Sequence, residues 1–149
     1  MPEPRPPLSS APTAAPRQRR FIFVLLDQFT LLSFSSALEC LRIANRMSGQ
    51  PLYAWTLQSE EGEPVTCSGG VSFNVDGPLG EVGREDFVMI CGGIGVKEKT
   101  TKKLMNWLRR ESRKGAAIGG LCTAAHVLAK GQATPDKVAL AILGLGRAE

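Results

Sequence analysis

The chain has 149 residues, 43% of them hydrophobic, which suffices for one core of ordinary size but not for two domains. Its formal charge of +4 is concentrated at the start, because residues 1–20 hold four arginines and one glutamate (+3) and the remainder carries only +1. This near-neutral remainder gives no reason to expect nucleic-acid binding. The chain has no secretory signal and no apolar run long enough for a membrane span, so we expect a cytoplasmic protein that does not enter membranes.

The N-terminal segment is predicted to be disordered. Six of the ten prolines lie within the first sixteen residues, and the segment has no apolar periodicity. We therefore interpret residues 1–19 as a Pro/Arg-rich arm and expect the folded domain to cover residues 20–130.

A strand and a helix are predicted to open the folded part. Residues 21–26 form a continuous apolar run, as in a parallel strand that is buried on both faces. Phe34, Leu38 and Leu41 then recur at helical spacing. Together these segments predict a first β–α unit.

Further strands and a helix follow. Residues 53–57 and 71–75 alternate between apolar and polar as strands do, and residues 87–91 form another buried strand that ends in a Gly-Gly pair. Residues 100–113 carry an apolar stripe at helical spacing, and residues 116–119 supply the next strand. The order predicts a flavodoxin-like α/β sandwich with a mostly parallel sheet, in which ligands bind at the carboxyl ends of the strands.

Cys122 occupies the most informative position in the sequence. The short strand runs through Gly119 and Gly120 into Cys122, and helix-forming residues follow at once. This strand-to-helix pattern is typical of a nucleophile elbow, which lifts one residue out of the sheet. The start of the following helix favours a thiolate or a bound anion.

Three motifs carry a resemblance to a known family. They are RFIFVLLDQFTLLSFSSALECLRIAN near the start, DFVMICGGIGV in the middle and IGGLCTAAHVLAK around the elbow. In this order and spacing they resemble the sensor domain of GlxA-type AraC-family transcriptional regulators, in the PfpI branch of the class I glutamine amidotransferase-like superfamily. The resemblance covers residues 20–130.

The resemblance also indicates which residues form the site. Ser33 stands in the loop after the first strand, where hydrolase relatives usually carry an acid that hydrogen-bonds to the cysteine, and Thr123 stands where they often carry a histidine. Both departures argue against catalysis, so no catalytic residue is assigned unless Cys122 acts as a nucleophile. We predict a ligand site formed by Ser33, Gly92, Gly93, Cys122 and Thr123. For the two glycines, a ligand contact, a close backbone passage and a plain turn all stay open.

The other reactive side chains are expected to be inert. Cys40, Cys67 and Cys91 lack a neighbouring base and are predicted to be buried thiols. His126 is predicted to pack or to be hydrogen-bonded, and Glu39 to make a structural contact. The cysteine spacing indicates neither a disulfide nor a metal site, and no cofactor is expected.

The last segment does not resemble the family. Residues 131–149 are interpreted as a divergent tail, with a frameshift or early stop as our hypothesis, so the sheet is expected to be incomplete at the C-terminus. The resemblance implies a domain that senses a small nitrogenous metabolite, an amino acid or a quaternary amine, truncated before its helix-turn-helix domain and unable to bind DNA by itself. A homodimer, a cysteine-dependent hydrolase or glyoxalase-like enzyme, and a non-functional fragment are the alternatives left open.

Overall fold

A six-stranded parallel sheet lies at the centre of the computed structural model, which describes residues 17–130 and 138–139. The strand order is β5-β2-β1-β6-β7-β8, and each printed pairing within this sheet is parallel. The strands are β1 (Arg19–Leu25), β2 (Tyr53–Ser59), β5 (Gly77–Pro78), β6 (Phe87–Cys91), β7 (Ala117–Leu121) and β8 (Val138–Ala139). The predicted mostly parallel α/β fold is therefore confirmed. The predictions for residues 1–16, 131–137 and 140–149 lie outside the described residues.

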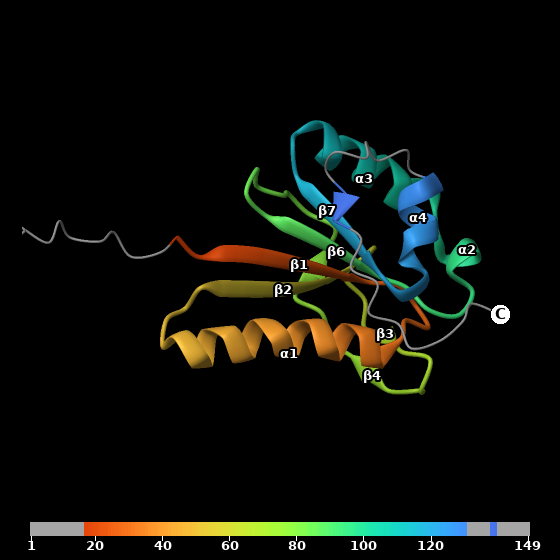
Figure 1. The fold of residues 1–149 in the computed structure, drawn as a ribbon. Coiled ribbons are helices and arrows are strands. Elements are labelled where there is room, and N and C mark those ends of the chain that lie inside the picture. The colour runs from red at the N-terminus through yellow and green to blue at the C-terminus, as the bar shows by residue number, and fades with distance from the viewer. Residues whose placement is uncertain (1–16, 131–137, 140–149) are drawn as a thin grey trace, which may run out of the picture.

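Helices cover both faces of the sheet (Figure 1). On one face lies α1 (Leu31–Ser48), together with a small antiparallel hairpin of β3 (Val65–Thr66) and β4 (Ser72–Phe73). On the other face lie α2 (Val96–Lys99), α3 (Lys102–Arg113), a 3-10 turn at Cys122–Ala124 and α4 (Ala125–Lys130). Within the described residues, no helix is long and apolar enough to cross a membrane.

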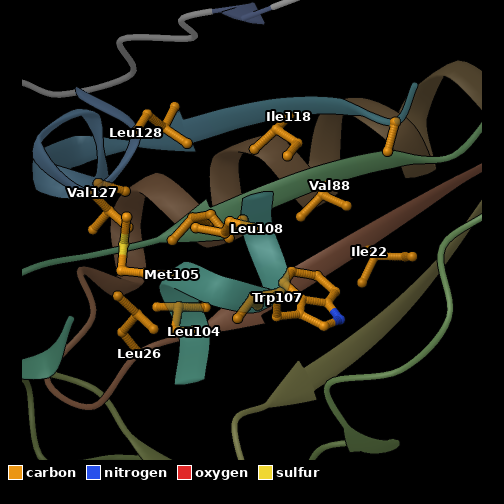
Figure 2. Packing of buried hydrophobic residues seen from close by; sticks show 14 of the residues in the cluster. Ile22, Leu26, Val88, Leu104, Met105, Trp107, Leu108, Ile118, Val127 and Leu128 are labelled. Atoms are coloured by element: carbon orange, nitrogen blue, oxygen red, sulfur yellow. The ribbon is translucent and has the colours of Figure 1, made fainter. Parts of the chain in front are cut away.

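Two hydrophobic clusters hold the layers together because the strand side chains alternate between the two faces. Ile22 and Val24 of β1 face the cluster under α3 and α4, which Figure 2 shows packed around Trp107 and Leu108. Phe23 and Leu25 face the cluster under α1, where aromatic rings meet edge to face. The continuous apolar run of β1 is thus buried on both faces, as predicted.

Most predicted elements are present, and one is wrong. The buried strand at residues 87–91 coincides with β6, and the predicted helix at 100–113 becomes α3, which Thr101 caps through a hydrogen bond from Leu104 N (3.1 Å). The predicted strand at 71–75 shrinks to β4, which pairs with β3 outside the main sheet. Alternation of apolar residues indicates an extended segment with one buried face, but it does not determine the strand that pairs with it.

The topology places the site. From β1 the chain crosses to β2 on one side and later returns to β6 on the other side, so the order reverses between β1 and β6. The loops that follow β1, β6 and β7 all leave the sheet at its carboxyl edge (Figure 1). Open parallel sheets bind ligands at such a point.

Candidate functional site

Cys122 adopts the strained backbone that the elbow pattern predicts. It directly follows the last residue of β7 and begins the 3-10 turn that leads into α4, with a φ of 56°. Gln28, at the end of the loop after β1, is the other non-glycine residue with a positive φ (64°) in the described part of the chain. Both lie at the carboxyl edge of the sheet. Backbone strain of this kind concentrates at functional sites.

Thr30 supplies the side chain that contacts the thiol. Thr30 precedes α1 as its N-cap residue, yet its side chain makes no capping hydrogen bond. Its hydroxyl Oγ1 lies 3.4 Å from Cys122 Sγ instead. Threonine at an N-cap normally accepts a hydrogen bond from the first turn of the helix, so here that interaction is exchanged for one with the thiol.

The two glycines let the loop after β1 pass close to the loop after β6. Thr30 N donates to Gly92 O (3.0 Å) and Ile94 N donates to Gln28 O (3.2 Å), so Phe29 and Gly93 form an isolated antiparallel bridge. A Cβ atom on Gly93 would lie 2.2 Å from Gln28 O. The structure therefore gives Gly93 a packing role, and its contact with a ligand stays a prediction.

Gly92 and Thr123 fasten the elbow to β6. A Cβ on Gly92 would lie 2.9 Å from Ala124 N, so the turn after Cys122 packs directly on this glycine. Thr123 Oγ1 donates to Gly93 O at 2.8 Å. The hydroxyl that replaces the expected histidine thus holds the two loops together, which fixes the position of Cys122 relative to Thr30.

Ser33 lies in the first turn of α1, not in the loop where the sequence placed it. Its side chain is buried on the side of α1 that carries Phe34. The helix begins at Leu31, because the loop after β1 is only five residues long. Ser33 and Cys122 both belong to the carboxyl edge, while Thr30 makes the printed hydrogen bond to the thiol.

The remaining reactive groups lie away from this site or are shielded. Cys67 and Cys91 are buried, and burial raises the pKa of the Cys91 thiol far above its ordinary value, so Cys91 is inert. Cys40 is exposed, and the prediction that it is buried is wrong. His126 is exposed on α4 and is not the packed histidine that we expected. Glu39 is exposed and pairs with Arg42, whose hydrogen bond lowers the pKa of Glu39.

Three free cysteine environments and one elbow thiol leave little room for metal chemistry. No cluster of three or more metal-ligating side chains exists among the residues that the structure describes. The chemical equipment around Cys122 is a hydroxyl, the Thr123 hydroxyl that is bonded to a carbonyl, and backbone. Such groups bind polar ligands by hydrogen bonds, and a base that would activate the thiol is not among its printed partners.

Comparison with known proteins agrees with this geometry. The model of the DJ-1/PfpI family matches residues 19–140. The chain belongs to the DJ-1/PfpI family. Within this family the central parallel sheet and the cysteine on a sharp turn after β7 are the features that the structure places together.

The similar proteins are transcriptional regulators. The HTH-type transcriptional regulator GbdR of Pseudomonas aeruginosa is 37% identical over 123 residues, which are 80% of this chain and 34% of that protein. The HTH-type transcriptional regulator GlxA of Rhizobium meliloti is 37% identical over 112 residues, 74% of this chain and 35% of that protein. This DJ-1/PfpI chain thus spans about a third of the length of the curated relatives that it matches.

A solved structure supports the same assignment. The crystal structure of an AraC family transcriptional regulator from Pseudomonas putida superposes with a TM-score of 0.71 at 25% identity, covering 83% of this chain and 80% of that chain. The resemblance to GlxA-type AraC-family regulators that the sequence motifs indicate is confirmed by these comparisons.

Sequence reasoning missed two residues of the site, Gln28 and Thr30. Both belong to the loop that follows β1, and both end at the same edge as Cys122. The available signal was their position: polar residues directly after a buried parallel strand lie at the carboxyl edge. The side-chain direction of Thr30 had no sequence signal, because a threonine before a helix ordinarily predicts a cap.

Proposed function

We propose that this chain is the sensing part of an AraC-type transcriptional regulator, and that it binds a small nitrogenous metabolite without converting it. The observation that carries the proposal is the contact of Cys122 with the Thr30 hydroxyl, where a cysteine enzyme needs an acid or an imidazole. The similarity to transcriptional regulators supports the same conclusion. An amino acid or a quaternary amine is the ligand class that we propose.

The proposed ligand lies at the carboxyl edge, against the elbow and the loops after β1 and β6. Cys122, Thr30, Thr123 and Ser33 offer hydrogen-bonding side chains there, and the Gly92-Gly93 turn offers backbone. The same edge carries an ion pair between Lys99 Nζ and Asp27 Oδ2 (2.9 Å), whose two side chains are about half exposed. A charge of each sign beside hydrogen-bonding groups suits a small zwitterion such as an amino acid or a betaine.

Calorimetry with a panel of amino acids and quaternary amines tests this proposal. We expect one member to bind, and we expect Cys122→Ala to weaken its binding roughly ten- to a hundredfold, as for the loss of a charge-assisted hydrogen bond. Gly77→Ala is the matched control, because a Cβ there meets nothing within 4 Å. A panel without any binder, or a binder that is indifferent to Cys122→Ala, would place the function or the site elsewhere.

We propose in addition that residues 1–149 by themselves form no sequence-specific complex with DNA. The net charge of +4 resides mostly in residues 1–20, and the rest is close to neutral. A gel shift at physiological salt with the promoter beside the gene tests this. Salt-sensitive smearing through the arginines agrees with the proposal, whereas a discrete, sequence-dependent complex contradicts it.

A cysteine-dependent hydrolase or glyoxalase-like enzyme is the second candidate. The positive φ of Cys122 favours it, because enzymes use such elbows to present a nucleophile. Turnover of a small ester, amide or 2-oxoaldehyde that disappears in Cys122→Ser would establish the enzyme. Turnover that survives in Cys122→Ser, or none at all, favours the sensor.

A further inference from the structure

The outward face of α1 carries apolar side chains where a helix that covers a sheet is expected to be polar. Leu32 is 61% exposed, Ile43 is 48% exposed and Met47 is 81% exposed. These three residues recur at intervals that place them on one side of the helix, opposite the side on which Phe34 packs against the sheet. We call Leu32, Ile43 and Met47 the outer stripe of α1.

The outer stripe has the dimensions of a helix-packing surface. From Leu32 to Met47 it extends for roughly 22 Å along the helix axis at about 1.5 Å per residue. Cys40 and Ser36 lie beside it, and Cys40 is exposed. A long, narrow apolar stripe of this kind fits another helix better than it fits a small ligand.

The charges beside the stripe are arranged for contact with a copy of the same helix. Glu39 lies one turn before Ile43 and Arg46 lies one turn after it, and both are exposed. When two α1 helices cross in antiparallel orientation at Ile43, the residues before the crossing on one helix face the residues after the crossing on the other. Each Glu39 then faces the Arg46 of the other copy, on both sides of an apolar centre.

We propose that two copies of this chain associate through the outer stripe of α1, with the two helices antiparallel and centred on Ile43. A twofold contact of this kind needs a self-complementary surface, and the order acid, apolar centre, base along α1 provides it. Because a single helix pair is a small interface, the dimer is in reversible, concentration-dependent equilibrium with the monomer. The same arrangement gives the otherwise unused exposed thiol of Cys40 a place at the border of the contact.

Sedimentation of the 149-residue chain over a wide range of concentrations tests the proposal. We expect a monomer–dimer equilibrium that Ile43→Asp weakens at least about tenfold, because the change buries a charge at the centre of the contact. Ile94→Asp is the matched control: it is another exposed apolar residue (69%), but it lies after β6 and is expected to leave the dimer unchanged. Circular dichroism verifies that both variants keep their helices. A monomer at every concentration, or a dimer that resists Ile43→Asp, overturns the proposal.

Charge reversal tests the antiparallel geometry. Arg46→Glu places two acids opposite each other and is expected to weaken the dimer, and combining it with Glu39→Lys is expected to restore it. If neither single reversal affects association, the antiparallel arrangement is wrong.

The alkylation rate of Cys40 distinguishes a second copy from a segment of the same chain. If two copies meet on α1, iodoacetamide modifies Cys40 more slowly as the chain concentration rises. Protection of Cys40 that is equal at all concentrations in a monomer means that the chain covers its own stripe, and this result overturns the proposal.

Discussion

The hydroxyl of Thr30 lies 3.4 Å from the thiol of Cys122, and it makes no capping hydrogen bond to α1, the helix that Thr30 precedes. The two residues are far apart in sequence and meet only because β1 and β7 are parallel strands whose carboxyl ends lie at one edge. The helix therefore gives up a cap, and the thiol gains a hydrogen-bonding partner that has no acid–base function at neutral pH.

Thr30→Val separates these two roles. Since the hydroxyl does not cap α1, we expect the unfolding free energy to change by less than about 0.5 kcal/mol. Alkylation of Cys122 is expected to slow roughly two- to tenfold, because the thiolate loses a hydrogen-bond donor. Thr101→Val is the matched control: Thr101 caps α3, and its loss is expected to lower the unfolding free energy by about 1 kcal/mol. Equal destabilisation by both variants would show that Thr30 acts as a cap after all.

Gly93→Ala is expected to damage the fold and not only the site. The new Cβ would lie 2.2 Å from Gln28 O and 2.9 Å from Thr30 N, and both are backbone atoms that cannot rotate away. We expect a loss of at least about 3 kcal/mol in urea unfolding. Gly77→Ala, which has free space, should change stability by less than about 1 kcal/mol. A Gly93→Ala variant as stable as the unmodified chain would mean that the loops after β1 and β6 are not held together as described.

Glu111 is a buried carboxylate that is only partly satisfied. Its Oε1 accepts from Arg110 Nε (3.0 Å) and lies 3.4 Å from Lys114 Nζ, whereas its Oε2 is buried without a partner among the described residues. Replacing such a group by an apolar side chain of similar volume is often neutral or stabilising, so we expect Glu111→Met to raise the unfolding free energy by up to about 1 kcal/mol. Chemical denaturation measures this. A loss of more than about 2 kcal/mol would indicate that the ion pairs outweigh the desolvation cost.

Asp86 should make stability depend on acid pH. Partial burial by itself raises the pKa of Asp86, but hydrogen bonds from Arg20 and from Gly83 N, together with the charge of Arg20, lower it below its ordinary value. The interaction thus stabilises the fold fully above the unfolded pKa of about 3.9, and the contribution is lost as the pH falls from there toward the lowered folded value.

Asp86→Asn tests this pH dependence. We expect the variant to be less stable than the unmodified chain at neutral pH by at most about 1 kcal/mol, with the difference vanishing toward pH 2. Glu85→Gln removes a fully surface-exposed pair with Arg17 and serves as the control without a measurable effect. A difference that persists unchanged in acid would contradict the assignment.

The fold was predictable where burial dominates. Residues 87–91 are apolar on both faces, and no arrangement other than a central strand buries them, so β6 has the predicted bounds. The positive φ of Cys122 followed from a strand that runs into a helix without a loop. β4 was not predictable in the same way, because its pairing with β3 depends on a turn and not on a core.

The site was predictable in position but not in contacts. The sequence placed Cys122 and Thr123 at the carboxyl edge, yet the bond from Thr123 to the carbonyl of Gly93 arises from loop geometry that periodicity does not encode. Thr30 carries the signal of an ordinary helix cap, so its contact with the thiol was hidden. Ser33 entered α1 because the loop after β1 is short.

Protection of individual cysteines by a ligand tests the central claim most directly. The chain is treated with iodoacetamide in the presence and absence of each candidate amino acid or quaternary amine, and mass spectrometry follows modification at each cysteine. Our account predicts that one ligand protects Cys122 and is recovered unchanged, while the exposed Cys40 on α1 reacts at the same rate with and without it. Chemical conversion of the ligand, or binding that leaves the alkylation of Cys122 unaltered, would contradict a non-catalytic sensor site at the elbow.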